Sequence, residues 1–206
     1  VTEPDFHSAR EVKAFLEELH AVVKQLGVSD VNMEQGSMRL EPNISLSTDP
    51  KKLPNYKVEV KNINSFSFVE KAIRYEIKRQ EEILEEGNRP AQETRGWDEN
   101  RQKTFSQRSK EEAHDYRYFP EPDIPPIITS KEDISRLKSE VPELPEKKLI
   151  RFIKEFSLPE YDAEILTREK PLADFFEEAV KAGTEQKIKP KEIANFIINK
   201  KVAHPE

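Results

Sequence analysis

The chain has 206 residues, of which 36% are charged and 35% hydrophobic, and its formal net charge is −6. This length suits one or two domains with a buried core, and the negative charge does not favour nonspecific binding to a polyanion. Cysteine is absent, which excludes disulfides and thiolate metal sites, and no apolar run has the length of a membrane span.

Two long amphipathic helices are predicted in the first half of the chain, over residues 8–26 and 66–86. Each begins with the spacing of a capping box, which in the second helix involves Ser67 and Glu70. A glycine follows each segment and favours the end of the helix there.

Between these helices, residues 38–47 and 57–63 alternate polar and apolar side chains. This pattern predicts two antiparallel strands of a half-exposed sheet. Their odd-numbered residues are polar, so Glu41 and Glu59 are expected to share one face. Pro42 cannot donate to a neighbouring strand, which predicts an edge strand or a bulge.

From residue 88 to about 129 no regular pattern is visible, and the segment is predicted to be a long ordered loop, because it is rich in aromatic residues. After Ser130 short helical patterns alternate with proline, which favours the first turn of a helix. The sequence therefore predicts an α+β unit over residues 1–129 and an all-helical domain over residues 130–206.

Carboxylates are the first candidates for chemistry. Glu41 and Glu59 on one sheet face, with Asp98 or Glu99 from the long loop, are the kind of oxygen ligands that Mg²⁺ takes together with phosphates. Because the chain has 40 acidic residues, ordinary surface acids beside Lys57 and Lys61 explain the spacing more simply.

Arginines between residues 89 and 117 are the second candidates, since arginine binds phosphate through two hydrogen bonds. The set comprises Arg89, Arg95, Arg101, Arg108 and Arg117. Acids are interleaved with them, so an internal ion-pair network that orders the loop is an equally good interpretation. No glycine-rich nucleotide-binding motif is present in the sequence.

Several blocks of sequence resemble the B subunit of the tRNA-dependent amidotransferases. They include VTEPDF, GVSDVNMEQGSMR, EVKNINSFSFVEKAIRYEIKRQ, QETRGWDE and RSKEEAHDYRYFPEPDIPP. The last of these is the strongest family marker. The resemblance covers nearly the whole chain and implies a cradle-like catalytic domain built on an antiparallel sheet with flanking helices, followed by the helical domain.

That resemblance implies part of a cytoplasmic heterotrimeric enzyme, a glutamine-hydrolysing carbon–nitrogen ligase whose other members are the A (glutaminase) and C subunits. The B subunit uses ATP and Mg²⁺ to phosphorylate the side-chain carboxylate of misacylated Glu-tRNA(Gln) or Asp-tRNA(Asn). Ammonia channelled from the glutaminase then displaces phosphate and gives the amide. A noncatalytic tRNA-binding or scaffold protein is the alternative, and it would tolerate loss of the acids.

Carried onto this sequence, the resemblance implies catalytic and metal-binding roles for Glu41 and Glu59, and a further metal-ligand role for Glu99. Glu41 stands where the family usually has Asp, in the run LEPN. Arg95, Arg108 and Arg117 are the expected contacts to phosphate or to the tRNA.

Two segments of the family are missing from the sequence: an opening portion with further His and Glu metal ligands, and the C-terminal tail domain. The chain is therefore expected to hold half of the family's metal ligands and to be inactive alone.

Overall fold

The computed structural model describes residues 1–49, 52–109 and 120–200, with the backbone alone for residues 108 and 109. It divides into two compact units. Unit 1 comprises Val1–Glu18 and Val31–Ile127, and unit 2 comprises Leu19–Asp30 and Ile128–Glu206. The division into a cradle-like catalytic domain over residues 1–129 and a helical domain over residues 130–206 stays a prediction.

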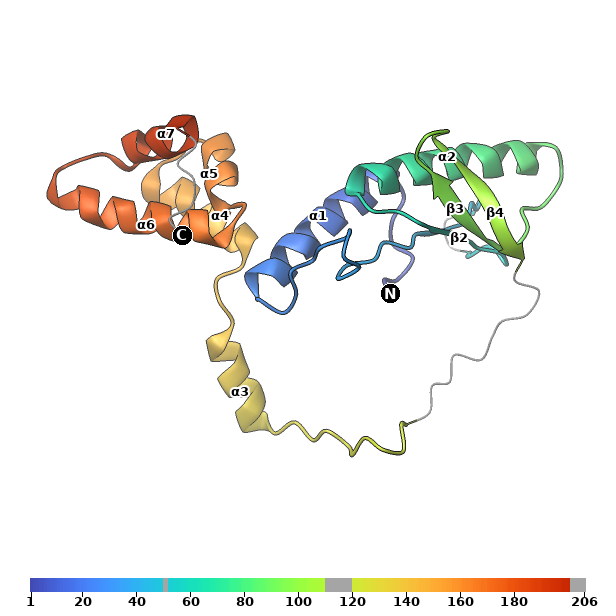
Figure 1. Ribbon diagram of the computed structural model, residues 1–206, viewed down its shortest axis with the longest axis horizontal. Coiled ribbons are helices and arrows are strands. Elements are labelled where there is room, and N and C mark those ends of the chain that lie inside the picture. The colour runs from blue at the N-terminus through green and yellow to red at the C-terminus, as the bar shows by residue number, and fades with distance from the viewer. Residues whose placement is uncertain (50–51, 110–119, 201–206) are drawn as a thin grey trace. The chain divides into compact units, whose positions relative to one another are not determined.

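Unit 1 combines two long helices with a small sheet (Figure 1). Its elements are α1 (Ala9–Gln25), whose last turns fall in unit 2, β1 (Asn43–Ile44), β2 (Val58–Lys61), α2 (Phe66–Glu85), β3 (Glu93–Asp98) and β4 (Lys103–Ser109). The helices and the first two strands lie within the predicted segments. The α+β class is thereby confirmed for this unit.

The four strands lie in the order β1-β2-β3-β4, and the sheet is mixed. β1 pairs with β2 and β3 with β4 in antiparallel fashion, whereas β2 and β3 are parallel. The expected antiparallel sheet is thus right for the outer pairs and wrong for the central pair. Helix α2 connects β2 to β3 as a crossover, and such a connection makes the two strands parallel. Pro42 precedes the edge strand β1, as predicted from its missing N–H.

A hairpin of β3 and β4 occupies part of the predicted loop, so that prediction is wrong for residues 93–109. The strands lack apolar alternation because their inward positions carry Glu93, Arg95 and Thr104, all buried or nearly so. The partners of these side chains are charged residues of α2. A pattern of hydrophobic residues does not reveal strands that are buried through ion pairs.

The core of unit 1 lies between the sheet and the two helices. Val58 and Val60 of β2 are fully buried and pack with Val69, Ala72 and Ile73 of α2. In Figure 1, α2 lies beside the sheet and crosses the direction of β3 and β4. Because side chains alternate along a strand, Glu59 and Lys61 face away from this core.

Helix α2 has its N-cap two residues earlier than the predicted capping box implies. The N-cap is Ser65, whose side-chain oxygen accepts a hydrogen bond from the backbone N–H of Phe68 at 3.1 Å. Ser67 lies inside the first turn and is exposed. Glu70 instead pairs with Arg74, at 2.8 Å.

Ser65→Ala is expected to lower the free energy of unfolding by about 1 kcal/mol, because the Phe68 N–H loses its partner at the helix start. Urea denaturation followed by circular dichroism measures the change. Ser67→Ala, two residues away and exposed, is the matched control and should leave stability unchanged or slightly higher. Equal midpoints for the two variants would contradict the assignment of the cap.

Unit 2 contains the helices α3 (Lys131–Glu140), α4 (Pro145–Phe156), α5 (Glu160–Thr167), α6 (Lys170–Glu185) and α7 (Pro190–Lys200). Helices α4 to α7 form a bundle, in which Phe152 and Phe176 are fully buried and their ring centroids are 5.1 Å apart. Leu149, Ile153 and Phe156 of α4 and Leu172 and Phe175 of α6 are partly buried and pack against the core of this bundle. In the part of the chain that the structure describes, no helix has both the length and the apolar character needed to cross a membrane.

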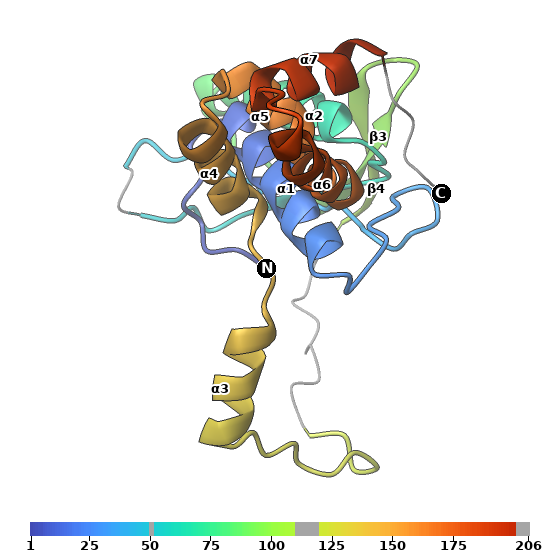
Figure 2. The ribbon, with the colours of Figure 1, turned by 90° about the vertical axis from the view of Figure 1, so that its left-hand side faces the viewer.

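Helix α3 stands apart from this bundle in both views (Figures 1 and 2). Its capping box is formed by Ser130 and Asp133, and none of its residues is buried. Local hydrogen bonds and capping therefore contribute more to this helix than burial of its side chains does.

Candidate active site

Two carboxylates meet on the sheet face that points away from the core. Asn43 of β1 is opposite Glu59 of β2, which places Glu41 beside Lys61. Lys61 Nζ lies 3.7 Å from Glu41 Oε1 and 3.5 Å from Glu59 Oε1. The predicted shared face for the two acids is confirmed, and a lysine bridges them. We call Glu41 and Glu59 the acid pair.

Thr94 of β3 holds the second oxygen of Glu59. It is the register partner of Glu59, and its Oγ1 donates to Glu59 Oε2 at 3.1 Å. The Glu59 side chain is only 12% exposed, whereas that of Glu41 is 42% exposed. Glu59 is therefore the more firmly oriented of the two acids.

We call this side of the sheet the open face; its described members include Glu41, Glu59, Lys61, Thr94, Gly96, Phe105 and Gln107. They follow from the strand register, in which Lys61, Gly96 and Phe105 are consecutive cross-strand partners. Residues one position away on each strand point into the core instead.

Glu99 does not join the acid pair in this structure. It is an exposed residue of the turn between β3 and β4 and lies five residues beyond Thr94, the neighbour of Glu59. At about 3.3 Å per residue, this separation is roughly 16 Å along the strand. Among the described residues, no group of three or more His, Asp or Glu side chains is placed to hold a metal.

The predicted arginine contacts fall in three different situations. Arg95 faces the core side of the sheet and is 12% exposed. Arg108 is the register partner of Thr94 at the irregularity in β4, and only its backbone is described. Arg117 lies outside the described residues. Their roles toward a substrate stay predictions.

Arg95 belongs to a buried charge network, which we define as Glu76 and Arg79 of α2 with Glu93 and Arg95 of β3. Arg95 Nη1 lies 2.6 Å from Glu93 Oε1, and its Nε lies 3.1 Å from Glu76 Oε1. Arg79 Nη2 lies 2.8 Å from Glu76 Oε2. The network holds two acids and two arginines, so its formal charges cancel.

Hydroxyl and amide groups complete the hydrogen bonds of this network. Thr104 of β4 donates to Glu76 and accepts from Arg95 Nε at 2.8 Å, while Ser106 donates to Glu93. Gln80 donates to Glu76 Oε2 at 3.1 Å and accepts from the hydroxyl of Tyr56 at 3.1 Å. The network thus joins α2 to β3 and β4, on the side opposite the acid pair.

Burial raises the pKa of Glu76, but hydrogen bonds from Arg79, Thr104 and Gln80 outweigh it and hold that pKa below its ordinary value. Glu76 is therefore ionised at neutral pH although its side chain is fully buried. The sequence carries a signal for this residue. Glu76 occupies the buried stripe of α2 with Val69, Ala72 and Ile73, where a charged residue needs a partner.

The roles of Lys61 and Thr94 at the acid pair are not evident from the sequence. Alternation alone presents Lys61 only as a neighbouring surface charge. Thr94 lies in the segment predicted to be a loop. Its position opposite Glu59 follows only from the parallel register of β2 and β3, which the sequence pattern does not predict.

The fold and the open face together define an α+β domain that presents paired carboxylates from one side of a sheet. Residues 1–135 match the family model of the GatB/GatE catalytic domain. The chain belongs to this family.

Curated relatives agree with that assignment. The chain is 52% identical over 198 residues to the B subunit of the aspartyl/glutamyl-tRNA(Asn/Gln) amidotransferase of Thermodesulfovibrio yellowstonii, covering 96% of the chain and 41% of the relative. The proteins of the same name from Carboxydothermus hydrogenoformans and Thermotoga petrophila are 48% and 50% identical, over 97% and 96% of the chain. The chain spans about two-fifths of the length of these relatives, 40% in both of the latter cases.

Proposed function

We propose that this chain forms part of the ATP-dependent half of a tRNA-dependent amidotransferase. Its substrate is the side-chain carboxylate of glutamate or aspartate attached to a noncognate tRNA, and its partners are the A (glutaminase) and C subunits. The acid pair on the open face is the observation that supports this proposal most directly, because paired carboxylates are ligands that Mg²⁺ takes together with phosphates. A relative named as the B subunit of such an amidotransferase is 52% identical to the chain over 198 residues.

The donor set fits a magnesium ion that is shared with phosphates. Mg²⁺ takes oxygen ligands, commonly one or two carboxylates together with substrate phosphates and water. Glu41 and Glu59 supply two carboxylates, and the lysine between them shows that a positive charge is accommodated there. When bound, the metal would offset the negative charge of the phosphates.

The remaining side chains have roles that follow from their contacts. Thr94 fixes the orientation of Glu59 through its hydrogen bond. Lys61, 34% exposed on a flexible stem, is placed to move from the acid pair to a phosphate once a metal takes its position. We assign Arg95 to support of β3, since its guanidinium is bound to Glu93, Thr104 and Glu76 on the other face.

The overall reaction has two steps. The γ-phosphoryl group moves from ATP to a carboxylate oxygen of the aminoacyl side chain, with release of ADP. The nitrogen of ammonia then bonds to the carbonyl carbon, the carbon–oxygen bond to phosphate breaks, and one proton is lost, which gives the amide. Phosphorylation converts a poor leaving oxygen into a good one.

The test uses the full-length protein assembled with its partner subunits. With misacylated Glu-tRNA and γ-labelled ATP in the absence of an ammonia source, we expect label to move to the esterified glutamate and ADP to form. Uncharged tRNA is the control and should give neither product. Binding of the misacylated tRNA with no ATP consumption would contradict the proposal and favour the noncatalytic scaffold.

A further inference from the structure

An exposed aromatic ring lies on β4, two strands away from β2, which carries Glu59 of the acid pair. The register pairs Lys61 of β2 with Gly96 of β3, and Gly96 with Phe105 of β4. These three residues form one row across the open face. Neighbouring strands are about 4.8 Å apart, so Lys61 and Phe105 are roughly 10 Å apart along this row.

Gly96 makes room for this ring. A Cβ atom on Gly96 would stand 2.6 Å from Cζ of Phe105 and 2.6 Å from Nε2 of Gln107. The ring and the amide therefore occupy the space that a side chain at position 96 would need. Despite that contact Phe105 keeps 43% of its surface exposed.

Protection of the glycine is the simpler explanation for the ring, because an aromatic residue beside a glycine shields the sheet backbone. That role needs only an apolar side chain of similar volume. It leaves unexplained why a large aromatic surface stays exposed on the same sheet face as a lysine and two carboxylates. An exposed aromatic face with a neighbouring amide is, by contrast, the arrangement that stacks a nucleobase.

We propose that Phe105 stacks on the adenine ring of ATP and that the Gln107 amide hydrogen-bonds to the edge of that base. This assignment rests on the proposed function, which brings ATP to the acid pair. Lys61 and the acid pair take the phosphates and their metal at the other end of the row, so the base and phosphate ends of one nucleotide are both satisfied. Phe105 thereby determines nucleotide affinity.

Binding measurements on the full-length protein with its partner subunits test this directly. The probes are ATP and inorganic tripolyphosphate, each with Mg²⁺, the second lacking a base. Phe105→Leu, which still covers Gly96, is expected to weaken ATP binding about 10-fold while leaving tripolyphosphate binding unchanged. Phe105→Tyr keeps the aromatic face and should bind ATP like the wild type.

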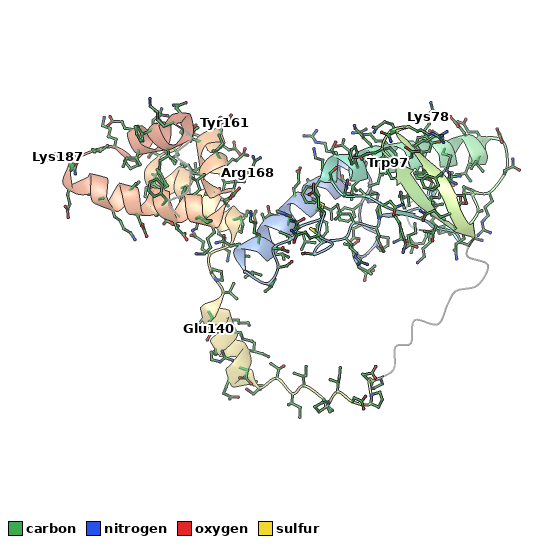
Figure 3. The ribbon with its side chains drawn as sticks, in the orientation of Figure 1. Lys78, Trp97, Glu140, Tyr161, Arg168 and Lys187 are labelled. Carbon is green, nitrogen blue, oxygen red and sulfur yellow. The ribbon has the colours of Figure 1, made fainter. Side chains whose placement is uncertain are left out.

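Tyr161→Leu is the matched control, since Tyr161 is an aromatic residue 71% exposed on α5 in unit 2 (Figure 3). It should leave both affinities unchanged. If Phe105→Leu fails to fold, Phe105→Met takes its place with the same expectation.

Three results would overturn the inference. One is wild-type ATP affinity in Phe105→Leu, and another is an equal loss of ATP and tripolyphosphate binding in that variant. The third is a raised KM for the misacylated tRNA with ATP binding intact. That result would indicate that Phe105 contacts the terminal base of the tRNA and not the adenine of ATP. Failure of the proposed function is distinguishable, because the wild type would then bind neither probe.

Discussion

Replacing the buried carboxylate of Glu76 with an amide is expected to lower the free energy of unfolding by about 3–5 kcal/mol. Glu76 is fully buried and contacts Arg79 at 2.8 Å and Arg95 at 3.1 Å. Glu76→Gln leaves these two guanidinium groups with Glu93 as their remaining carboxylate. A buried charge without its counter-charge is far more costly than a missing surface ion pair.

Chemical denaturation followed by circular dichroism measures this loss. Glu82→Gln is the control on the same helix, because Glu82 is 61% exposed and lies 3.9 Å from Lys78 (Figure 3). That exposed pair contributes at most about 1 kcal/mol. Similar unfolding midpoints for the two variants would show that the network does not hold α2 against the hairpin.

The same residue predicts a dependence of stability on pH. The folded-state pKa of Glu76 is held below its ordinary value of 4.5. Its contribution is therefore present above the unfolded pKa and is lost as the pH falls through the folded pKa. Between pH 7 and pH 3 the wild type should lose more stability than Glu76→Gln, and parallel curves would contradict this.

Glu59→Gln is expected to slow phosphate transfer to the misacylated tRNA by about 100-fold or more in the full-length complex. A metal ion supplies several kcal/mol of charge stabilisation in such reactions, and each 1.36 kcal/mol is a factor of ten. The amide keeps the volume of Glu59 and an oxygen to accept from Thr94, so the fold should be preserved.

Single-turnover transfer of label from γ-labelled ATP measures the rate, and equilibrium binding measures the affinity for tRNA, which should not change. Glu17→Gln provides the control, since Glu17 is 52% exposed on α1 and pairs only weakly with Lys13, at 3.8 Å. A wild-type rate in Glu59→Gln would remove the acid pair from the chemistry and leave the scaffold interpretation standing.

Local signals allow most helices to be predicted from sequence. In unit 2 the capping serine at 130 and the prolines at 145 and 190 mark helix starts, and apolar stripes mark the buried sides. These signals act within one or two turns, so no knowledge of distant residues is needed.

The β3–β4 hairpin escapes prediction because its burial depends on distant partners. Glu93 and Arg95 are buried only since α2 supplies Glu76 and Arg79 at the matching positions. At the candidate site the alternation of polar residues is enough to bring Glu41 and Glu59 together. The lysine and threonine that contact them depend on strand register, which alternation alone does not fix.

Trp97 makes unit 1 separately observable in solution. It is the one tryptophan of the sequence, is 5% exposed, and its ring centroid lies 6.4 Å from that of Phe68 (Figure 3). Its indole N–H is buried without a hydrogen-bond partner among the described residues. Tryptophan fluorescence should therefore shift to longer wavelength only when the sheet and α2 separate. Unfolding of the α4–α7 bundle alone should leave the emission unchanged. One emission spectrum, recorded beside circular dichroism, distinguishes the unfolding of the two units within a single chain.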